Sequence, residues 1–147
     1  MRILLDLNLI LDVLIDREPY AEESSALWAA IENHEAEGFL SAHCVTTLHC
    51  LAARSGHGQF GDQCVSDVLS VFGVAAVDRS VLENAVGMGW ADFEDAVCVA
   101  AAVASGCQAV ATRDREGFKS STLPVLSAKE ALAAIRLSPG RADEPAP

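Results

Sequence analysis

The sequence lacks the features that would place the protein in a membrane or in an oxidising compartment. No stretch of membrane-spanning length is free of charge, and the apolar opening MRILLDLNLILDVLI is interrupted by Asp6, Asn8 and Asp12, with no small-residue cleavage site after it. The five cysteines include no CxxC pair, and the four histidines do not join them at a zinc-binding spacing. We therefore expect a cytoplasmic protein with reduced cysteines and no structural zinc.

Basic and aromatic residues are also scarce. The chain has 10 Lys and Arg against 21 Asp and Glu, which gives a net charge of −11. This balance argues against broad, salt-driven binding to duplex nucleic acid, because that affinity grows with the number of phosphates neutralised. Aromatic residues make up 5% of the chain and do not interleave with basic residues as in a base-stacking platform. One local basic group stands out, formed by Arg113, Arg115 and Lys119.

What is present is the composition of one globular domain, with 51% hydrophobic and 21% charged residues in 147. Short apolar runs predict strands at residues 3–5, 39–40, 72–78, 108–114 and 124–127. Amphipathic or apolar segments predict one helix that starts at residue 8, another that starts after residue 92, and further helices at residues 21–38, 45–55, 63–71, 80–86 and 128–135. This alternation predicts a three-layer α/β/α sandwich with a central parallel sheet of four to five strands. We place the domain at 1–137 and a flexible tail at 138–147.

One predicted helix carries a dense group of acids at its start. In DFEDAVCVAAAVASG, Asp92, Glu94 and Asp95 precede a run of Ala, Val and Cys that is typical of a buried helix. Asp92 suits the N-cap, and Asp95 suits the capping-box position three residues later. Acidic side chains in a first turn also complement the helix dipole. These local roles are sufficient on their own, so a second role for Asp95 depends on the rest of the chain.

Three acids are expected at one edge of the sheet. Asp6 closes the first strand, Asp114 closes the strand AVAT, and Asp95 lies in the first turn of the helix between them. In such folds ligands bind at the carboxyl edge of the strands. Two carboxylates about 4 Å apart repel by roughly 4 kcal/mol at an effective dielectric of about 20, which is large beside a total stability of about 5–15 kcal/mol. A divalent cation removes this repulsion, and an all-oxygen site suits Mg²⁺ or Mn²⁺.

Two segments together resemble the PIN-domain family. ILLDLNLILDVLIDREPY is similar to the family's opening strand, Asp-Thr-Asn and helix. DFEDAVCVAAAVASGCQAVATRDREGF is similar to its acid-led Ala-rich helix, followed by a strand ending in Thr-Arg-Asp. Either segment alone is a weak signal, and the pair in this order is fairly specific. The resemblance extends from Met1 to about Leu126 and is strongest to small VapC-like toxins of type II toxin-antitoxin pairs.

The resemblance implies a metal-dependent endoribonuclease that uses Mg²⁺ or Mn²⁺, is neutralised by a small antitoxin protein and forms a homodimer. The catalytic and metal-binding acids would be Asp6, Asp95 and Asp114, with Asp92 as a second-tier ligand. Asn8 and Thr112 would support them at the strand ends. Beside such a site, the basic group of Arg113, Arg115 and Lys119 is expected to contact the RNA backbone.

The sequence departs from the family pattern at two positions. Leu7 replaces the usual Thr of Asp-Thr-Asn, and Thr47 stands where a Glu is usual on the helix after the second strand. A catalytically weakened PIN-like module that binds RNA or a protein partner is therefore an alternative. A phosphohydrolase of the haloacid dehalogenase type also opens with a strand and an Asp, but it requires a second Asp where Asn8 stands.

Overall fold

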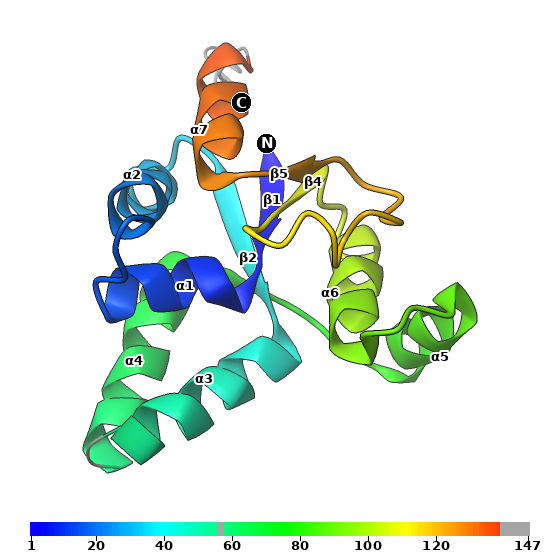
Figure 1. The fold of residues 1–147 in the computed structure, drawn as a ribbon, viewed down its shortest axis with the longest axis horizontal. Helices are drawn as coiled ribbons and strands as arrows, with labels where there is room; N and C mark the ends of the chain where they lie inside the picture. The colour runs from blue at the N-terminus through cyan, green and yellow to red at the C-terminus, as the bar shows by residue number, and fades with distance from the viewer. Residues whose placement is uncertain (56–57, 139–147) are drawn as a thin grey trace, which may run out of the picture.

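The computed structural model describes residues 1–55 and 58–138, in which parallel strands alternate with helices (Figure 1). The strands are β1 (Arg2–Leu5), β2 (Glu37–Ser41), β3 (Gly73–Ala75), β4 (Ala109–Ala111) and β5 (Val125–Leu126). The helices are α1 (Leu7–Leu14), α2 (Ala21–Glu32), α3 (Ala42–Ser55), α4 (Gly58–Val71), α5 (Arg79–Met88), α6 (Phe93–Ala104) and α7 (Ala128–Leu137). None of these described helices has the length and apolar character needed to cross a membrane. The tail was predicted at residues 138–147, and the part of it beyond residue 138 lies outside the described residues.

The strands form one sheet in the order β3-β2-β1-β4-β5, and every neighbouring pair is parallel. Within it, Ile3 of β1 pairs with Gly38 of β2 on one side and with Ala109 of β4 on the other. Ile3, Leu4 and Leu5 are all buried, because helices cover both faces, as is usual for parallel sheets. The predicted three-layer α/β/α sandwich with a parallel sheet is confirmed, with five strands.

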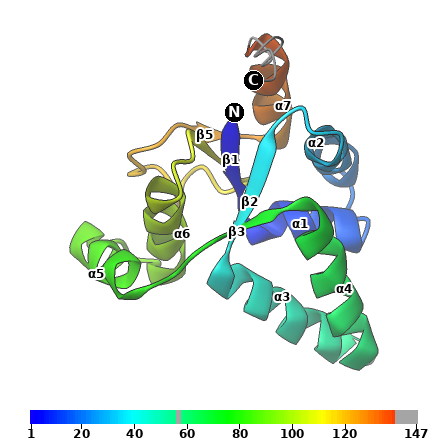
Figure 2. The same cartoon turned by 180° about the vertical axis from the view of Figure 1, so that it is seen from behind.

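The two faces of the sheet have separate cores. Ile3 and Leu5 pack with side chains of α1, α2, α3, α4 and α7, whereas Leu4 packs with α5 and α6 on the other side (Figures 1 and 2). Residues 96–102 of α6 are all buried, since this helix is enclosed between the sheet and α5. Its Ala-rich sequence suits that position because small side chains let both neighbours approach closely. The prediction of a buried acid-capped helix is therefore confirmed.

The second helix is shorter than predicted. It was expected to run to Gly38, but α2 ends at Glu32, and His34 has a φ of 62°, a left-handed conformation that interrupts a helix. Gly38 lies instead in β2, where a Cβ would come within 2.8 Å of the Ile31 and Phe72 side chains. The glycine marks close packing on a strand and does not cap a helix.

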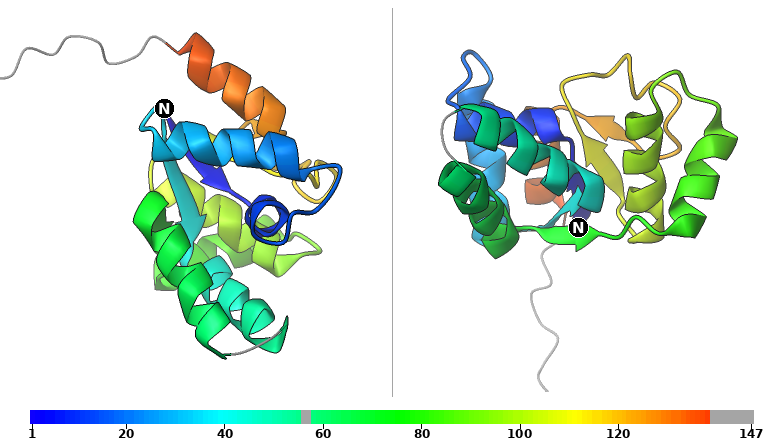
Figure 3. Two further views of the ribbon diagram at one scale, coloured as in Figure 1. Left: turned by 90° about the vertical axis from the view of Figure 1, so that its left-hand side faces the viewer. Right: turned by 90° about the horizontal axis from the view of Figure 1, so that it is seen from below.

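The fourth helix starts earlier than predicted. It begins at Gly58 instead of near Gln63, so it pairs with α3 as a long hairpin that Figure 3 shows from two sides. A Cβ at Gly61 would lie 3.1 Å from the His49 side chain, so the glycine lets the two helices approach. His49 and Asp62 then form a hydrogen bond between the helices, with Nε2 and Oδ1 2.9 Å apart. Gly61, which suggested a loop in the sequence, instead permits close packing of α4 against α3.

Candidate functional site

Thr112 joins two of the predicted acids at the carboxyl edge of the sheet. Its hydroxyl donates to Asp6 Oδ2 at 2.7 Å and accepts from the Asp114 N–H at 3.0 Å. The side chain of Asn8 also donates to Asp6 Oδ2, at 2.8 Å. Thr112 is fully buried, and the Asp6 N–H donates to the Ala111 carbonyl of β4 at 2.9 Å. The ends of β1 and β4 therefore hold Asp6 and Asp114 on one polar framework.

Asp6 does not serve as a helix-capping side chain. It occupies the N-cap position of α1, but its carboxylate makes no side-chain capping hydrogen bond to that helix. Both hydrogen bonds that it receives from side chains come from Thr112 and Asn8, and both are directed to Oδ2. The local capping explanation of this acid is thereby excluded, and its orientation is determined by contacts across the strand ends.

The carboxylates of Asp95 and Asp114 approach each other over Gly117. The Gly117 N–H donates to Asp114 Oδ1 at 2.8 Å. A Cβ built on Gly117 would overlap Asp114 Oδ2, and it would lie 2.9 Å from Asp114 Cγ and 3.0 Å from Asp95 Oδ2. The space between the two acids is thus open only because residue 117 has no side chain.

Asp92 caps α6, as the sequence predicts. Its Oδ1 accepts from the Glu94 N–H at 2.9 Å and from the Asp95 N–H at 3.3 Å. The return bond of a capping box, from the Asp95 carboxylate to the Asp92 N–H, does not occur in the described part of the chain. Asp95 instead turns toward Gly117, so capping is the role of Asp92 and the Asp95 side chain is directed into the acidic cluster.

The acids are close enough to change one another's pKa. Burial raises the pKa of Asp95 to about 7, together with the charges of Asp92, Asp6 and Asp114, in that order of importance. Burial also raises the pKa of Asp6, although its hydrogen bond from Thr112 acts in the opposite direction. The cluster therefore binds protons more readily than isolated carboxyls do, which is the electrostatic signature of a site that favours a cation.

The donors fit a hard divalent cation. All are oxygens, and the cradle over Gly117 leaves space beside Asp95 Oδ2 and Asp114 Oδ2. Within residues 1–55 and 58–138, oxygens of Asp6, Asp95 and Asp114 do not form a group lying within 4.8 Å of one another. Mg²⁺ usually keeps several of its waters in proteins, so carboxylates at this wider spacing suit an ion held partly through water.

We expect the metal-free protein to lose stability as the pH rises from about 5 to about 8. An acid whose folded-state pKa lies near 7, above its ordinary value of 3.8, favours the folded state only while it is protonated there, so the contribution disappears as pH rises through 7. Thermal unfolding in EDTA measures this slope. Asp95→Asn should flatten it, whereas the exposed Asp67→Asn should retain it; parallel profiles for the wild type and Asp95→Asn would contradict the assignment.

The predicted basic group is engaged with acids of the same chain. Arg113 Nε lies 2.9 Å from Oδ2 of the buried Asp12, and its guanidinium stacks 4.0 Å from the centroid of the Tyr20 ring. The other two members form exposed ion pairs: Arg115 with Glu130 and Lys119 with Glu116. Their expected contact with RNA remains a prediction, and the structure shows that such a contact would have to replace or accompany these pairs.

Thr47 leaves its side of the site neutral. It lies on α3, and its hydroxyl donates to the carbonyl of His43, one turn earlier, at 3.0 Å. The hydroxyl is therefore used within the helix. The three acids that the sequence singles out come from the other side, at the ends of β1 and β4 and at the start of α6.

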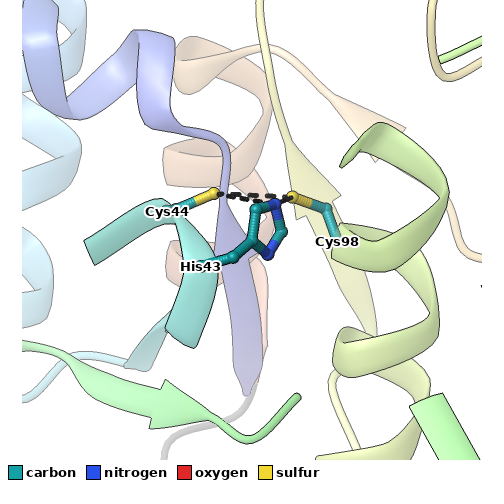
Figure 4. Close-up of side chains that lie close together, drawn as sticks. All are labelled: His43, Cys44 and Cys98. Atoms are coloured by element: carbon teal, nitrogen blue, oxygen red, sulfur yellow. Dashed lines mark hydrogen bonds between the residues drawn. The ribbon is translucent and has the colours of Figure 1, made fainter. Parts of the chain in front are cut away.

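Sequence reasoning missed a second cluster beside the acids, formed by His43, Cys44 and Cys98 (Figure 4). The two sulfurs lie 3.6 Å apart. A hydrogen bond from the Cys98 thiol, together with His43, lowers the pKa of Cys44 to about 5 against the effect of burial. The hydrogen bond to Cys44, together with burial, raises the pKa of Cys98. The only sequence signal is an adjacent His-Cys at a helix start, with no spacing that links it to Cys98.

A family model described as the PIN domain matches residues 2–116, which include the strand ends and all the acids of the cluster. The chain belongs to the PIN-domain family. No curated protein matches it.

Several solved structures share the fold of this PIN-domain chain. FitAcB from Neisseria gonorrhoeae matches at 23% identity and a TM-score of 0.67, over 86% of this chain and 97% of that one. VapBC2 from Rickettsia felis, bound to a promoter DNA fragment, matches at 11% identity and a TM-score of 0.69, over 86% of this chain and 98% of that one. VapC20 from Mycobacterium tuberculosis, a Sarcin-Ricin loop cleaving toxin, matches at 17% identity and a TM-score of 0.65, over 80% of this chain and 93% of that one. At these identities the likeness concerns the fold.

Proposed function

We propose that this chain is a divalent-metal-dependent endoribonuclease that hydrolyses RNA phosphodiester bonds at Asp6, Asp95 and Asp114. The observation that carries the proposal is the approach of the Asp95 and Asp114 carboxylates over Gly117, with Asp6 tied to the same strand end through Thr112. A group of carboxylates whose charges repel one another is unfavourable for folding alone. Its retention in the structure is explained by a cation, for which we propose Mg²⁺ or Mn²⁺.

The residues at the strand ends and at the start of α6 have different roles in the proposed reaction. When bound, the divalent ion supplies a Lewis acid for phosphoryl oxygens and lowers the pKa of a water. Thr112 and Asn8 hold Asp6 Oδ2, while the Gly117 N–H holds Asp114 Oδ1. The pKa of Asp95 is about 7 in the metal-free chain, and a bound cation would favour the ionised carboxylate that binds it. Asp92 remains a second-tier ligand, because one of its oxygens already caps α6.

Arg115 and Lys119 are the proposed contacts to the RNA backbone. Their ion pairs with Glu130 and Glu116 are exposed, and exposed pairs contribute only about 0–1 kcal/mol, so exchange for a phosphate is inexpensive. Arg113 differs, since it is held by the buried Asp12 and is 26% exposed. Of the three, we therefore assign phosphate binding mainly to Arg115 and Lys119.

We further propose that the chain acts as the toxin of a toxin-antitoxin pair, bound by a small antitoxin protein, and that it forms a homodimer. Two of the structures that share its fold are complexes named FitAcB and VapBC2. In this chain, exposed apolar side chains lie around a pocket of about 210 Å³ between α1, α3 and α4; its lining includes the exposed Ile15, Leu51 and Phe60. An apolar surface of this kind supports a protein partner.

A second candidate is a PIN-domain module that binds RNA or protein with little catalysis. The neutral Thr47 favours it, because its hydroxyl is bonded to the His43 carbonyl and adds no charge to the site. The wide spacing of the three acids also favours weak metal binding. RNA binding without metal-dependent cleavage would support this alternative.

We expect RNA cleavage by the wild type in Mg²⁺, its loss in EDTA, and a loss of metal affinity of about 10–100-fold in Gly117→Ala. The added methyl group would occupy the space between Asp95 and Asp114. Initial rates on a labelled single-stranded RNA, measured across a Mg²⁺ titration, test both points. Gly87→Ala is the matched control, since nothing lies within 4 Å of a Cβ there. Cleavage that is unaffected by EDTA would overturn the metal-dependent mechanism.

A further inference from the structure

Three side chains that the proposed nuclease chemistry does not use lie together between α3 and α6. His43 and Cys44 are on the first turn of α3, and Cys98 is on α6 (Figure 4). The sulfurs of Cys44 and Cys98 are 3.6 Å apart, and each lies 3.7 Å from His43 Nε2. The three atoms form a nearly equilateral triangle, and the two cysteines are 5% and 2% exposed.

This triangle has the dimensions of one face of a tetrahedral metal site. With Zn–S bonds of about 2.3 Å and Zn–N bonds of about 2.05 Å, tetrahedral angles place two sulfurs about 3.8 Å apart and a nitrogen about 3.6 Å from each sulfur. The observed separations of 3.6 and 3.7 Å agree with these values. An ion needs no large rearrangement of the three side chains to meet all of them.

The histidine is held in the orientation that a ligand requires. Its Nδ1 is hydrogen-bonded to the hydroxyl of Ser41, which is fully buried at the end of β2. A hydroxyl both donates and accepts, so Ser41 accepts from the tautomer in which Nδ1 carries the hydrogen and Nε2 presents its lone pair to the sulfurs. Metal-bound histidines characteristically have such a second partner, which fixes ring and tautomer.

We propose that His43 Nε2, Cys44 Sγ and Cys98 Sγ form a binding site for a thiophilic transition-metal ion of the Zn²⁺ class, separate from the carboxylate cluster. Three protein ligands leave a fourth position for water or another donor. The ligands are soft or borderline, whereas the acids at the sheet edge are hard oxygens, so the two sites select different metals. The inference does not depend on the proposed nuclease activity.

A metal explains the arrangement better than a disulfide does. A disulfide between Cys44 and Cys98 would involve the two sulfurs alone. It would not explain why Ser41 orients His43 toward them. Bound metal would connect the start of α3 to α6, and we expect the melting temperature to rise on binding.

The test uses Co²⁺ and Zn²⁺ on the reduced, metal-free full chain with excess Mg²⁺ present. One Co²⁺ per chain should produce the near-ultraviolet charge-transfer absorption that thiolate ligation gives, and Zn²⁺ should displace it. Cys44→Ser and Cys98→Ser should each remove this absorption and lower Zn²⁺ affinity by more than about a hundredfold. Cys64→Ala, at a buried thiol of the other core, should leave both unchanged.

Further variants distinguish this site from the acidic cluster. Asp95→Asn should retain the Co²⁺ absorption, because no carboxylate is a proposed ligand. Thermal unfolding of each metal-free variant establishes that it is folded, and Cys98→Ala provides a smaller substitution if Cys98→Ser does not fold. Absence of Co²⁺ absorption in the wild type, or its persistence in folded variants of both cysteines, would overturn the proposal. So would a Cys44–Cys98 disulfide that forms readily in a protein that takes up no metal.

Discussion

Asp6→Asn should lower the initial rate of RNA cleavage by at least about a hundredfold while the protein stays folded. Changes to groups that merely orient metal ligands typically cost 10–100-fold in affinity or activity, so loss of a proposed ligand should cost at least the upper end of that range. The substitution keeps an oxygen to accept the hydrogen bonds of Thr112 and Asn8. What it removes is the negative charge and the second carboxylate oxygen.

The measurement pairs cleavage of a labelled RNA with calorimetric binding of Mg²⁺ and Mn²⁺. Asp114→Asn should behave in the same way, because an amide oxygen can still accept from the Gly117 N–H. Asp67→Asn, an exposed position on α4, controls for the loss of one negative charge from the chain. Undiminished cleavage in both Asp6→Asn and Asp114→Asn would refute the carboxylate mechanism, whereas metal binding without cleavage in the wild type would favour the binding-module alternative.

The sheet and its acidic edge were accessible from the sequence because each rests on a local pattern. Ile3 to Leu5 and the run before Thr112 are short apolar strands with both faces buried, and each is followed directly by polar residues. Parallel strands align their carboxyl ends, so Asp6 and Asp114 had to lie near each other once the strands paired. The approach of Asp95 required one further element, the capped helix.

The remaining features depend on contacts that no local pattern encodes. Gly38 and Gly61 read as helix stops or loops, but each is selected by the close approach of another element, Ile31 in one case and His49 in the other. The cluster of His43, Cys44 and Cys98 brings together residues that are up to 55 positions apart. Only the packing of α6 against the end of β2 creates it, so a search for zinc-ligand spacing along the chain could not find it.

The role of Arg113 also depends on a tertiary contact that the sequence did not reveal. Its basic neighbours suggested an RNA-binding surface, yet its guanidinium lies between the Tyr20 ring and the fully buried carboxylate of Asp12. The Nε and Oδ2 atoms are 2.9 Å apart without the alignment of a hydrogen bond within the described chain, so attraction between the charges carries the contact. Asp12 has two weaker partners, Ser24 Oγ at 3.3 Å and Arg17 Nη1 at 3.7 Å.

Arg113→Met should therefore lower the free energy of unfolding by roughly 3 kcal/mol, because removing the nearer partner leaves the buried Asp12 charge with only the more distant Arg17. The midpoint of urea unfolding measures this loss. Arg79→Met is the matched control: its side chain is 90% exposed, its pair with Glu83 lies on the surface, and the expected change is under about 0.5 kcal/mol. Adding Asp12→Asn to Arg113→Met should recover part of the loss, since an uncharged amide at residue 12 no longer needs a cation. If Arg113→Met is as stable as the wild type and only RNA binding falls, the residue belongs to the nucleic-acid surface and not to the scaffold.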